Sequence, residues 1–219
     1  AALRFDYRGM GDSSGTVRSY AEIDADIAAA IAALQGAAPS IRRVVLWGLC
    51  DGASAALLYA QRRGDTRVAG LVLANPWLAG AQAEAHAIVH TYYRQRFLDP
   101  AFWRKLLGGG INPLHKWQEW RAYRRKARGD ATDAGDAAGA ALLAALERLS
   151  LPMLVLLSRR DATAQTFLAQ LDLAGSEVLE RSTVRGRTFE EADHTFSRAS
   201  WRKEVENVTI AWLNDAFLR

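Results

Sequence analysis

The feature that most constrains this chain is the stretch over residues 43–61, RVVLWGLCDGASAALLYAQ. Its β-branched, apolar run predicts a strand that ends near Gly48, and the Ala-rich segment beyond Gly52 predicts a helix. Only the few residues around Cys50 connect the two elements, so the backbone has to turn sharply there. We expect glycines to flank the cysteine because the strand and the helix leave no room for a Cβ at either side.

A cysteine in this turn is placed to act as a nucleophile. G-x-C-x-G has the spacing of the strand–turn–helix motif in which a nucleophile is presented above a sheet, with Cys in place of the commoner Ser. The unpaired amides and the positive end of the helix dipole favour the thiolate of Cys50. The alternative is a small, buried cysteine that only packs.

The rest of the chain alternates strands with helices. The sequence predicts strands over residues 3–5, 44–49, 68–74, 153–158 and 187–191, and helices over 20–35, 51–63, 163–173 and from about 198 onward. Ser19 and Glu22 form a capping-box pattern at the start of the first of these helices. This alternation predicts an α/β fold with a doubly wound, mostly parallel sheet, whose ligand site lies at the carboxyl ends of the strands.

Residues 6–15, DYRGMGDSSG, form a glycine-rich segment directly after the first predicted strand. No Lys-Ser or Lys-Thr follows the glycines, which argues against a phosphate-binding loop. We therefore expect a structural turn in which glycines adopt positive φ.

Three residues with complementary chemistry follow the ends of predicted strands, in the order Cys50, Asp161 and His194. We expect His194 to take the thiol proton, Asp161 to orient the imidazole, and the thiolate to attack a carbonyl carbon. The backbone N–H of Asp51 is the expected oxyanion donor. Taken singly, Asp161 is also explained as a loop or cap residue and His194 as a surface turn residue, and a second oxyanion donor is not evident in this chain.

The alternation stops at residue 76, and the sequence predicts a helical insertion, or lid, over 76–149 between core segments 1–75 and 150–219. Residues 94–128 hold ten Lys and Arg against two acids, an excess of +8 in a chain of net charge +4. Candidate substrate-contacting residues are Trp77, Tyr92, Tyr93 and Trp103. An anionic ligand or a lipid surface would suit this segment, although a solvated basic face is the favoured interpretation. Residues 129–141, mostly Ala, Gly and Asp, are expected to form a mobile linker.

Composition and motif spacing exclude several classes of protein. His86 and His90 lie four residues apart, but no third ligand and no H-E-x-x-H accompany them, so we expect no metal and no cofactor. The single cysteine forbids an intramolecular disulfide, and no apolar run is long enough to cross a bilayer. We expect a cytoplasmic protein that acts on a small acyl compound, for which an anionic group is one candidate, and that does not bind nucleic acid.

The strings GLCDGASAALLYA, YYRQRFLDPAFWRKLLGGGIN, SRRDATAQTF and ADHTFSRASWR together resemble the exosortase A system-associated α/β-hydrolases with a Cys elbow. The resemblance covers almost the whole chain. It implies an α/β-hydrolase fold with an inserted helical lid, a Cys50-His194-Asp161 triad and a link to exopolysaccharide and cell-envelope biogenesis. Against that pattern, the first strands and the second oxyanion loop are expected to be missing here.

These features lead to one main hypothesis and two alternatives. The main hypothesis is a hydrolase that cleaves an ester or thioester through an acyl-thioenzyme. The first alternative is an acyltransferase that uses the same triad with a hydroxyl acceptor. The second is a catalytically silent hydrolase fold that serves as a scaffold or binding protein.

Overall fold

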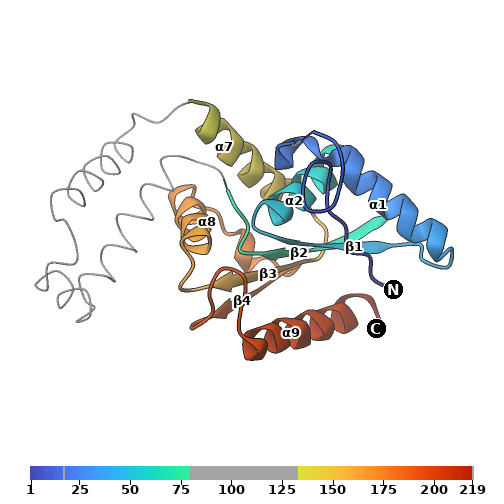
Figure 1. The fold of residues 1–219 in the computed structure, drawn as a ribbon. Coiled ribbons are helices and arrows are strands. Elements are labelled where there is room, and N and C mark those ends of the chain that lie inside the picture. The colour runs from blue at the N-terminus through green and yellow to red at the C-terminus, as the bar shows by residue number, and fades with distance from the viewer. Residues whose placement is uncertain (17, 79–132, 219) are drawn as a thin grey trace, which may run out of the picture.

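The computed structural model describes residues 1–16, 18–78 and 133–218, and Figure 1 shows their arrangement. The strands are β1 (Val44–Leu49), β2 (Val68–Ala74), β3 (Met153–Ser158) and β4 (Val184–Phe189). The α-helices are α1 (Asp24–Ala37), α2 (Asp51–Arg63), α7 (Asp133–Arg148), α8 (Ala162–Leu173) and α9 (Ala199–Phe217). Two short 3₁₀ turns, η1 (Tyr20–Glu22) and η3 (Val178–Glu180), complete the described elements.

The four strands form a parallel sheet in the order β1-β2-β3-β4. β3 is buried along its whole length and β2 along nearly all of it, as expected for central strands of a sheet covered on both faces. Parallel strands place all their carboxyl ends at one edge. Residues that follow β1, β2, β3 and β4 therefore converge there, although they are far apart in sequence.

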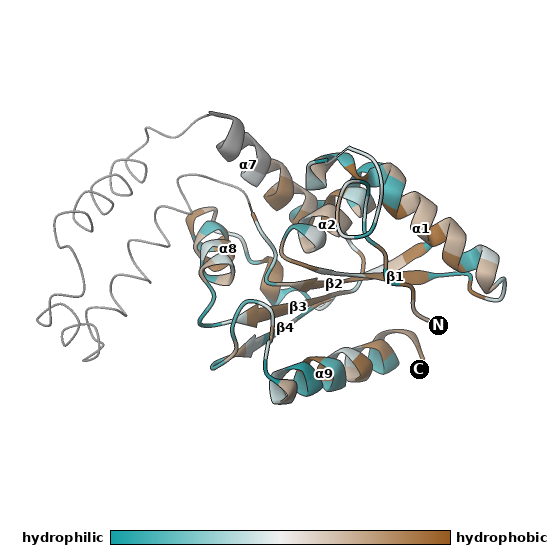
Figure 2. Cartoon of the chain, viewed as in Figure 1, coloured by the Kyte–Doolittle hydropathy of each residue, from teal (hydrophilic) through white to brown (hydrophobic). Residues whose placement is uncertain are grey.

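Helices cover both faces of the sheet, which confirms the doubly wound α/β prediction (Figure 1). On one face, α1, α2, α7 and α8 contribute to a large core whose biggest fully buried side chains include Tyr59 and Phe167. On the other face, α9 packs Val205 and Trp212 against Val72 and its neighbours in β3. Figure 2 shows the hydrophobic colours concentrated in the strands between these layers. Each large buried side chain stabilises the fold by about 1.5–3 kcal/mol.

The glycine-rich turn over residues 6–15 is structural, as predicted. The carboxylate of Asp6 accepts a hydrogen bond from the Asp12 N–H at 3.3 Å, and Gly9 and Gly11 both have positive φ. A Cβ on Gly11 would lie 2.2 Å from the Asp6 carboxylate, so only glycine fits there. Arg8 then ties the turn to α1 through an ion pair with Asp26 at 2.7 Å.

The strand predicted over residues 3–5 is not a strand in the structure. Leu3 and Phe5 are 46% and 41% exposed, and the segment has no ladder partner among the described residues. Leu3 and Phe5 instead line a cavity of about 570 Å³ together with residues of α1 and β1.

The other differences from the predicted elements are local. The capping box of Ser19 and Glu22 exists, but it caps η1, and α1 begins only at Asp24. β4 begins at Val184, three residues before the predicted start. The expected linker over 129–141 overlaps α7, because Ala is the best helix former and Leu142 and the residues after it supply a buried apolar face. The assignment of 76–149 to a lid stays a prediction, because residues 79–132 lie outside the described part.

Candidate active site

The turn between β1 and α2 holds Cys50 in a backbone conformation that is rare for a residue with a side chain, φ 57° and ψ −120°. The Cys50 N–H donates to the Ala74 carbonyl at the end of β2, at 2.9 Å. The Cys50 carbonyl accepts from the N–H groups of Ala53, Ser54 and Trp77, at 3.1–3.3 Å. These bonds from both neighbouring elements hold the strained conformation in place. The predicted strand–turn–helix is therefore confirmed.

The two glycines of the motif have different roles. A Cβ built on Gly48 would lie 2.4 Å from backbone atoms of Gly52 and Ala53, so the first glycine is required by the close approach of the helix to the strand. A Cβ on Gly52 would meet nothing within 4 Å. The expectation that both positions exclude a side chain is right for Gly48 and wrong for Gly52, because Gly52 faces open space on the first turn of α2.

The thiol of Cys50 is half-buried, and its environment raises its pKa. Burial has the largest effect, and the negative charges of Asp51 and Asp161 act in the same direction. A hydrogen bond from the Asp51 backbone N–H partly offsets them. The predicted shift toward thiolate is therefore wrong for the free protein: the helix amides do favour the anion, but burial and two carboxylates outweigh them.

Asp51 presents its backbone and its side chain to different partners. Its backbone N–H is directed at the Cys50 sulfur, where an oxyanion donor is expected. Its carboxylate accepts the Gly52 N–H at 2.8 Å and the Tyr7 hydroxyl at 3.0 Å. Burial and this carboxylate together raise the pKa of Tyr7 to about 12, so the phenol stays protonated and donates to Asp51. The glycine-rich turn is thus connected to the start of α2.

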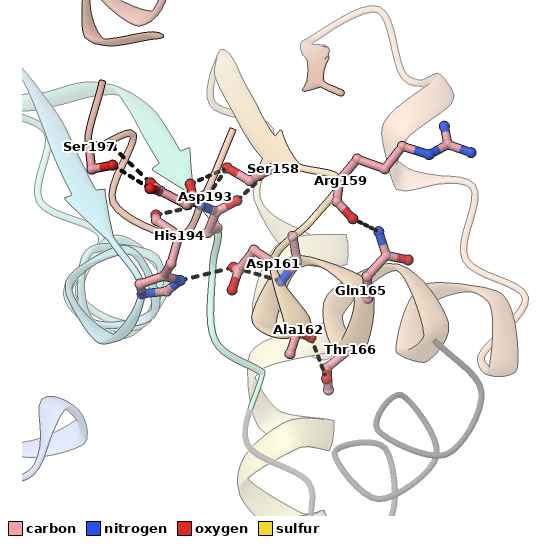
Figure 3. Close-up of polar contacts among 11 residues, drawn as sticks. Ser158, Arg159, Asp161, Ala162, Gln165, Thr166, Asp193, His194 and Ser197 are labelled. Carbon is pink, nitrogen blue, oxygen red and sulfur yellow. Dashed lines mark hydrogen bonds and ion pairs between the residues drawn. The ribbon is translucent and has the colours of Figure 1, made fainter. Parts of the chain in front are cut away.

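Asp161 and His194 are brought together at the carboxyl ends of β3 and β4 (Figure 3). The His194 Nδ1 lies 2.9 Å from Asp161 Oδ2, and the Asp161 side chain is 8% exposed. The same Oδ2 accepts the Ala164 N–H at 3.1 Å and so forms the N-cap of α8. From the sequence, Asp161 could be a helix cap or the partner of the histidine. In the structure one oxygen atom, Oδ2, makes both contacts. With a proton on Nδ1, the opposite ring nitrogen Nε2 is a free base.

A buried amide that the sequence analysis missed connects these elements. The side chain of Asn75, directly after β2, donates to the His194 carbonyl at 2.8 Å and to Ser158 Oγ at 3.0 Å. Its Oδ1 accepts the Ser158 N–H at 2.7 Å, and the Ser158 hydroxyl donates to the Asp193 carbonyl at 2.9 Å. Both side chains are inaccessible to solvent. The only signal in the sequence is a lone Asn after a buried strand and before a proline.

Comparison with known families identifies the architecture to which these groups belong. Residues 1–207 match the model of the alpha/beta hydrolase family. The chain belongs to the alpha/beta hydrolase family. The strand–turn–helix at Cys50 has the form of the nucleophile elbow known from this fold, with a thiol on the turn residue.

Solved structures share the fold of this α/β-hydrolase. An esterase from Exiguobacterium antarcticum matches with a TM-score of 0.54 and 21% identity, over 94% of this chain and 79% of that protein. An esterase from Pyrococcus furiosus matches with a TM-score of 0.59 and 14% identity, over 96% and 69%. A monoacylglycerol lipase from Paleococcus ferrophilus matches with a TM-score of 0.56 and 20% identity, over 97% and 82%. No curated protein matched the sequence.

The remaining predicted site residues divide between the described and undescribed parts of the hydrolase. Trp77 is half-buried beside the elbow, where its ring meets Tyr20 edge-on at 5.6 Å between centroids and its carbonyl accepts the Ser54 hydroxyl at 2.5 Å. The predicted residues Tyr92, Tyr93, Trp103, His86 and His90 lie outside the described residues.

Two further searches concern only the described part of the chain. No cluster of three or more His, Cys, Asp and Glu side chains within it is arranged to hold a metal ion. Among the helices in residues 1–78 and 133–218, none combines the length and the apolar character needed to cross a membrane.

Proposed function

We propose that this α/β-hydrolase cleaves an ester or thioester bond with Cys50 as nucleophile, His194 as base and Asp161 as the residue that orients the base. The observation that carries the proposal is the 2.9 Å contact between His194 Nδ1 and Asp161 Oδ2. This contact lies at the same edge of the sheet as the elbow. Together the three residues supply a nucleophile, a base and a fixed tautomer.

The reaction follows from the state of each group. Nε2 of neutral His194 removes the proton of the Cys50 thiol as Sγ attacks the acyl carbon, and the Asp51 N–H stabilises the oxyanion. The intermediate collapses to an acyl-thioenzyme, and the alcohol or thiol leaves with the proton from His194. Water then gives a proton to Nε2 and attacks the acyl group, which releases the acid and restores the thiol.

The raised pKa of Cys50 favours this general-base route over a resting thiolate–imidazolium pair. Among the described residues, no hydrogen bond joins the thiol to His194 in the free protein. Catalytic hydrogen bonds are often long before substrate binds and shorten in the complex. Substrate binding is therefore the step that we expect to bring sulfur and imidazole into contact.

The nature of the substrate rests on similarity. The similar structures include proteins named as esterases and one named as a monoacylglycerol lipase, which favours an oxygen ester of a carboxylic acid. The resemblance to exosortase-associated hydrolases further favours a role in cell-envelope biogenesis, with a cytoplasmic enzyme acting on an acyl compound, for which an anionic group is one candidate. The raised pKa of Cys50 also fits a second function, a silent hydrolase fold that serves as a scaffold.

A burst experiment with p-nitrophenyl acetate separates these functions. The enzyme should release p-nitrophenol in a burst that matches the enzyme concentration, and intact mass should show an acetyl group that is absent from Cys50→Ala. The turnover of the Asp161→Asn variant should be about 10⁴-fold lower than that of the wild type, because the tautomer of His194 is no longer fixed. Its thermal stability should hardly change, because Asn also caps a helix well.

The outcomes of this experiment are distinct. Acylation that persists in Cys50→Ala would contradict the assignment of the nucleophile. If the folded wild-type protein shows no burst with acetyl, butyryl or thioester substrates, the result favours the scaffold function over the hydrolase.

A further inference from the structure

We propose that Asn75 is a positioning residue that sets the separation between the nucleophile and the base, an inference that rests on the function proposed above. The Asn75 side-chain hydrogen bonds go to Ser158 and to the His194 backbone, not to the thiol or the imidazole ring. The Asn75 side chain thus holds the backbone of the histidine loop, through the His194 carbonyl at 2.8 Å.

The contacts of Asn75 form a continuous connection between Cys50 and His194. The Cys50 N–H is bonded to the carbonyl of Ala74, and Asn75 is the next residue. The Asn75 amide then bonds to the carbonyl of His194. Two hydrogen bonds and one peptide unit therefore connect the backbone of the nucleophile with the backbone of the base, which lie 144 positions apart in sequence.

Ser158 makes the connection rigid. Its hydroxyl oxygen accepts a hydrogen bond from the Asn75 amide, and its backbone N–H donates to the Asn75 amide oxygen. The Ser158 hydroxyl also donates its proton to the Asp193 carbonyl (Figure 3). Asp161 lies three residues further along and holds the His194 ring. The end of β3 thus fixes both the backbone and the side chain of the base. Without Asn75, the His194 carbonyl would lose its bond to the end of β2, and the loop would be held only from its other sides, by the Ser158–Asp193 bond, the Asp193–Ser197 bond, the ring contact and the buried Phe196.

The chemistry of the position matches this role. Asn75 has φ 42°, a conformation that asparagine tolerates better than most residues with a side chain. Both amide protons and the amide oxygen are satisfied by named partners, and the group is fully buried. A carboxylate of the same shape would keep the acceptor for the Ser158 N–H but lose both donors. It would also place a negative group against the carbonyl of His194.

Asn75→Asp is therefore the central variant, and Thr166→Val is its matched control. Thr166 is also a buried polar residue whose hydroxyl donates to a backbone carbonyl, that of Ala162 at 2.9 Å within its own helix rather than a carbonyl of the histidine loop. Ser158→Ala removes the bond to Asp193 and the acceptor for one Asn75 amide proton, while both partners of the Asn75–His194 bond remain. It provides a milder perturbation if Asn75→Asp does not fold.

The readouts are the rate of Cys50 acylation in a single turnover and the imidazole resonances of ¹⁵N-labelled His194. Asn75→Asp should acylate about 100-fold more slowly with its KM for p-nitrophenyl acetate unchanged, because displacements near 1 Å cost about that factor. The Ser158→Ala variant should acylate about tenfold more slowly than the wild type, a loss between those of the other two variants. Thr166→Val should acylate at the wild-type rate, and its His194 resonances should be unchanged, whereas those of Asn75→Asp should shift.

Either of two results would overturn the inference. The first is folded Asn75→Asp, or Ser158→Ala if the former does not fold, with wild-type acylation and wild-type His194 resonances. The second is an equal loss of acylation in Thr166→Val, which would mean that lost stability alone explains the effect. A wild-type protein that is never acylated at Cys50 contradicts the proposed function instead, and the resonances of His194 still report whether Asn75 positions the loop.

Discussion

Replacing Gly48 by Ala should be far more damaging than replacing Gly52 by Ala, although both glycines flank the same cysteine. At Gly48 the new Cβ would lie 2.4 Å from three backbone atoms of α2. Ordinary contacts begin at about 3.4 Å, so the overlap is about 1 Å against atoms that cannot rotate away. Overpacking of this kind costs about 3 kcal/mol.

Replacing Gly52 by Ala should instead raise the free energy of unfolding. The position is helical and open, and Ala is favoured over Gly in a helix by up to about 1 kcal/mol. The two variants should therefore differ by roughly 4 kcal/mol in their free energy of unfolding. In a domain of this size, that difference corresponds to about 10 °C in Tm.

Thermal unfolding followed by circular dichroism measures this difference directly, and urea unfolding checks it at 25 °C. Equal Tm values for Gly48→Ala and Gly52→Ala would refute the close contact between β1 and α2 on which the description of the elbow depends. A Gly52→Ala variant that loses several degrees would show that the space at that position is filled in solution.

Asp51→Asn should lower the pKa of Cys50, since one of the two carboxylates that raise it is removed while the backbone N–H of residue 51 remains. Alkylation by iodoacetamide at pH 7, measured by intact mass, should therefore be faster than in the wild type, and an unchanged rate would contradict this cause of the shift. Asp65→Asn should remove a stabilising contribution, because hydrogen bonds from Arg67 and Tyr59 hold the pKa of Asp65 well below its usual range. That contribution is fully present above about pH 4, the unfolded value, and is lost as the pH falls through the lower folded-state pKa. Wild type should thus exceed the variant in Tm at pH 7 and approach it in strong acid, and a pH-independent difference would contradict the assignment.

The sequence predicted the turn at Cys50 and the proximity of Asp161 to His194, because both follow from where the strands end. Gly48, Cys50 and the run of Ala and Leu after them define a strand, a turn and a helix without any knowledge of distant contacts. Asp161 follows a predicted strand closely and His194 follows another, and parallel strands necessarily bring their carboxyl ends together. The 2.9 Å contact between the two side chains confirms that inference.

The network around Asn75 could not be found in the same way. Its hydrogen bonds join residues that are 83 and 119 positions apart, and each member is an ordinary residue type at the end of a strand. The prediction that Cys50 would favour the thiolate was wrong for a related reason. The helix start was visible in the sequence, whereas burial of the thiol and the position of Asp161 appear only in the folded chain.

The double use of Asp161 Oδ2 has an evolutionary consequence. If Asp161 orients His194 as proposed, selection acts on this oxygen twice, once through the cap of α8 and once through the ring of His194. A descendant that abandoned its chemistry would be free to drift at Cys50 and His194, yet it would still be selected for a side chain that caps a helix. Asn, Ser or Thr at position 161 would then record the lost activity, while an aspartate retained there would by itself say nothing about whether a homologue is still an enzyme.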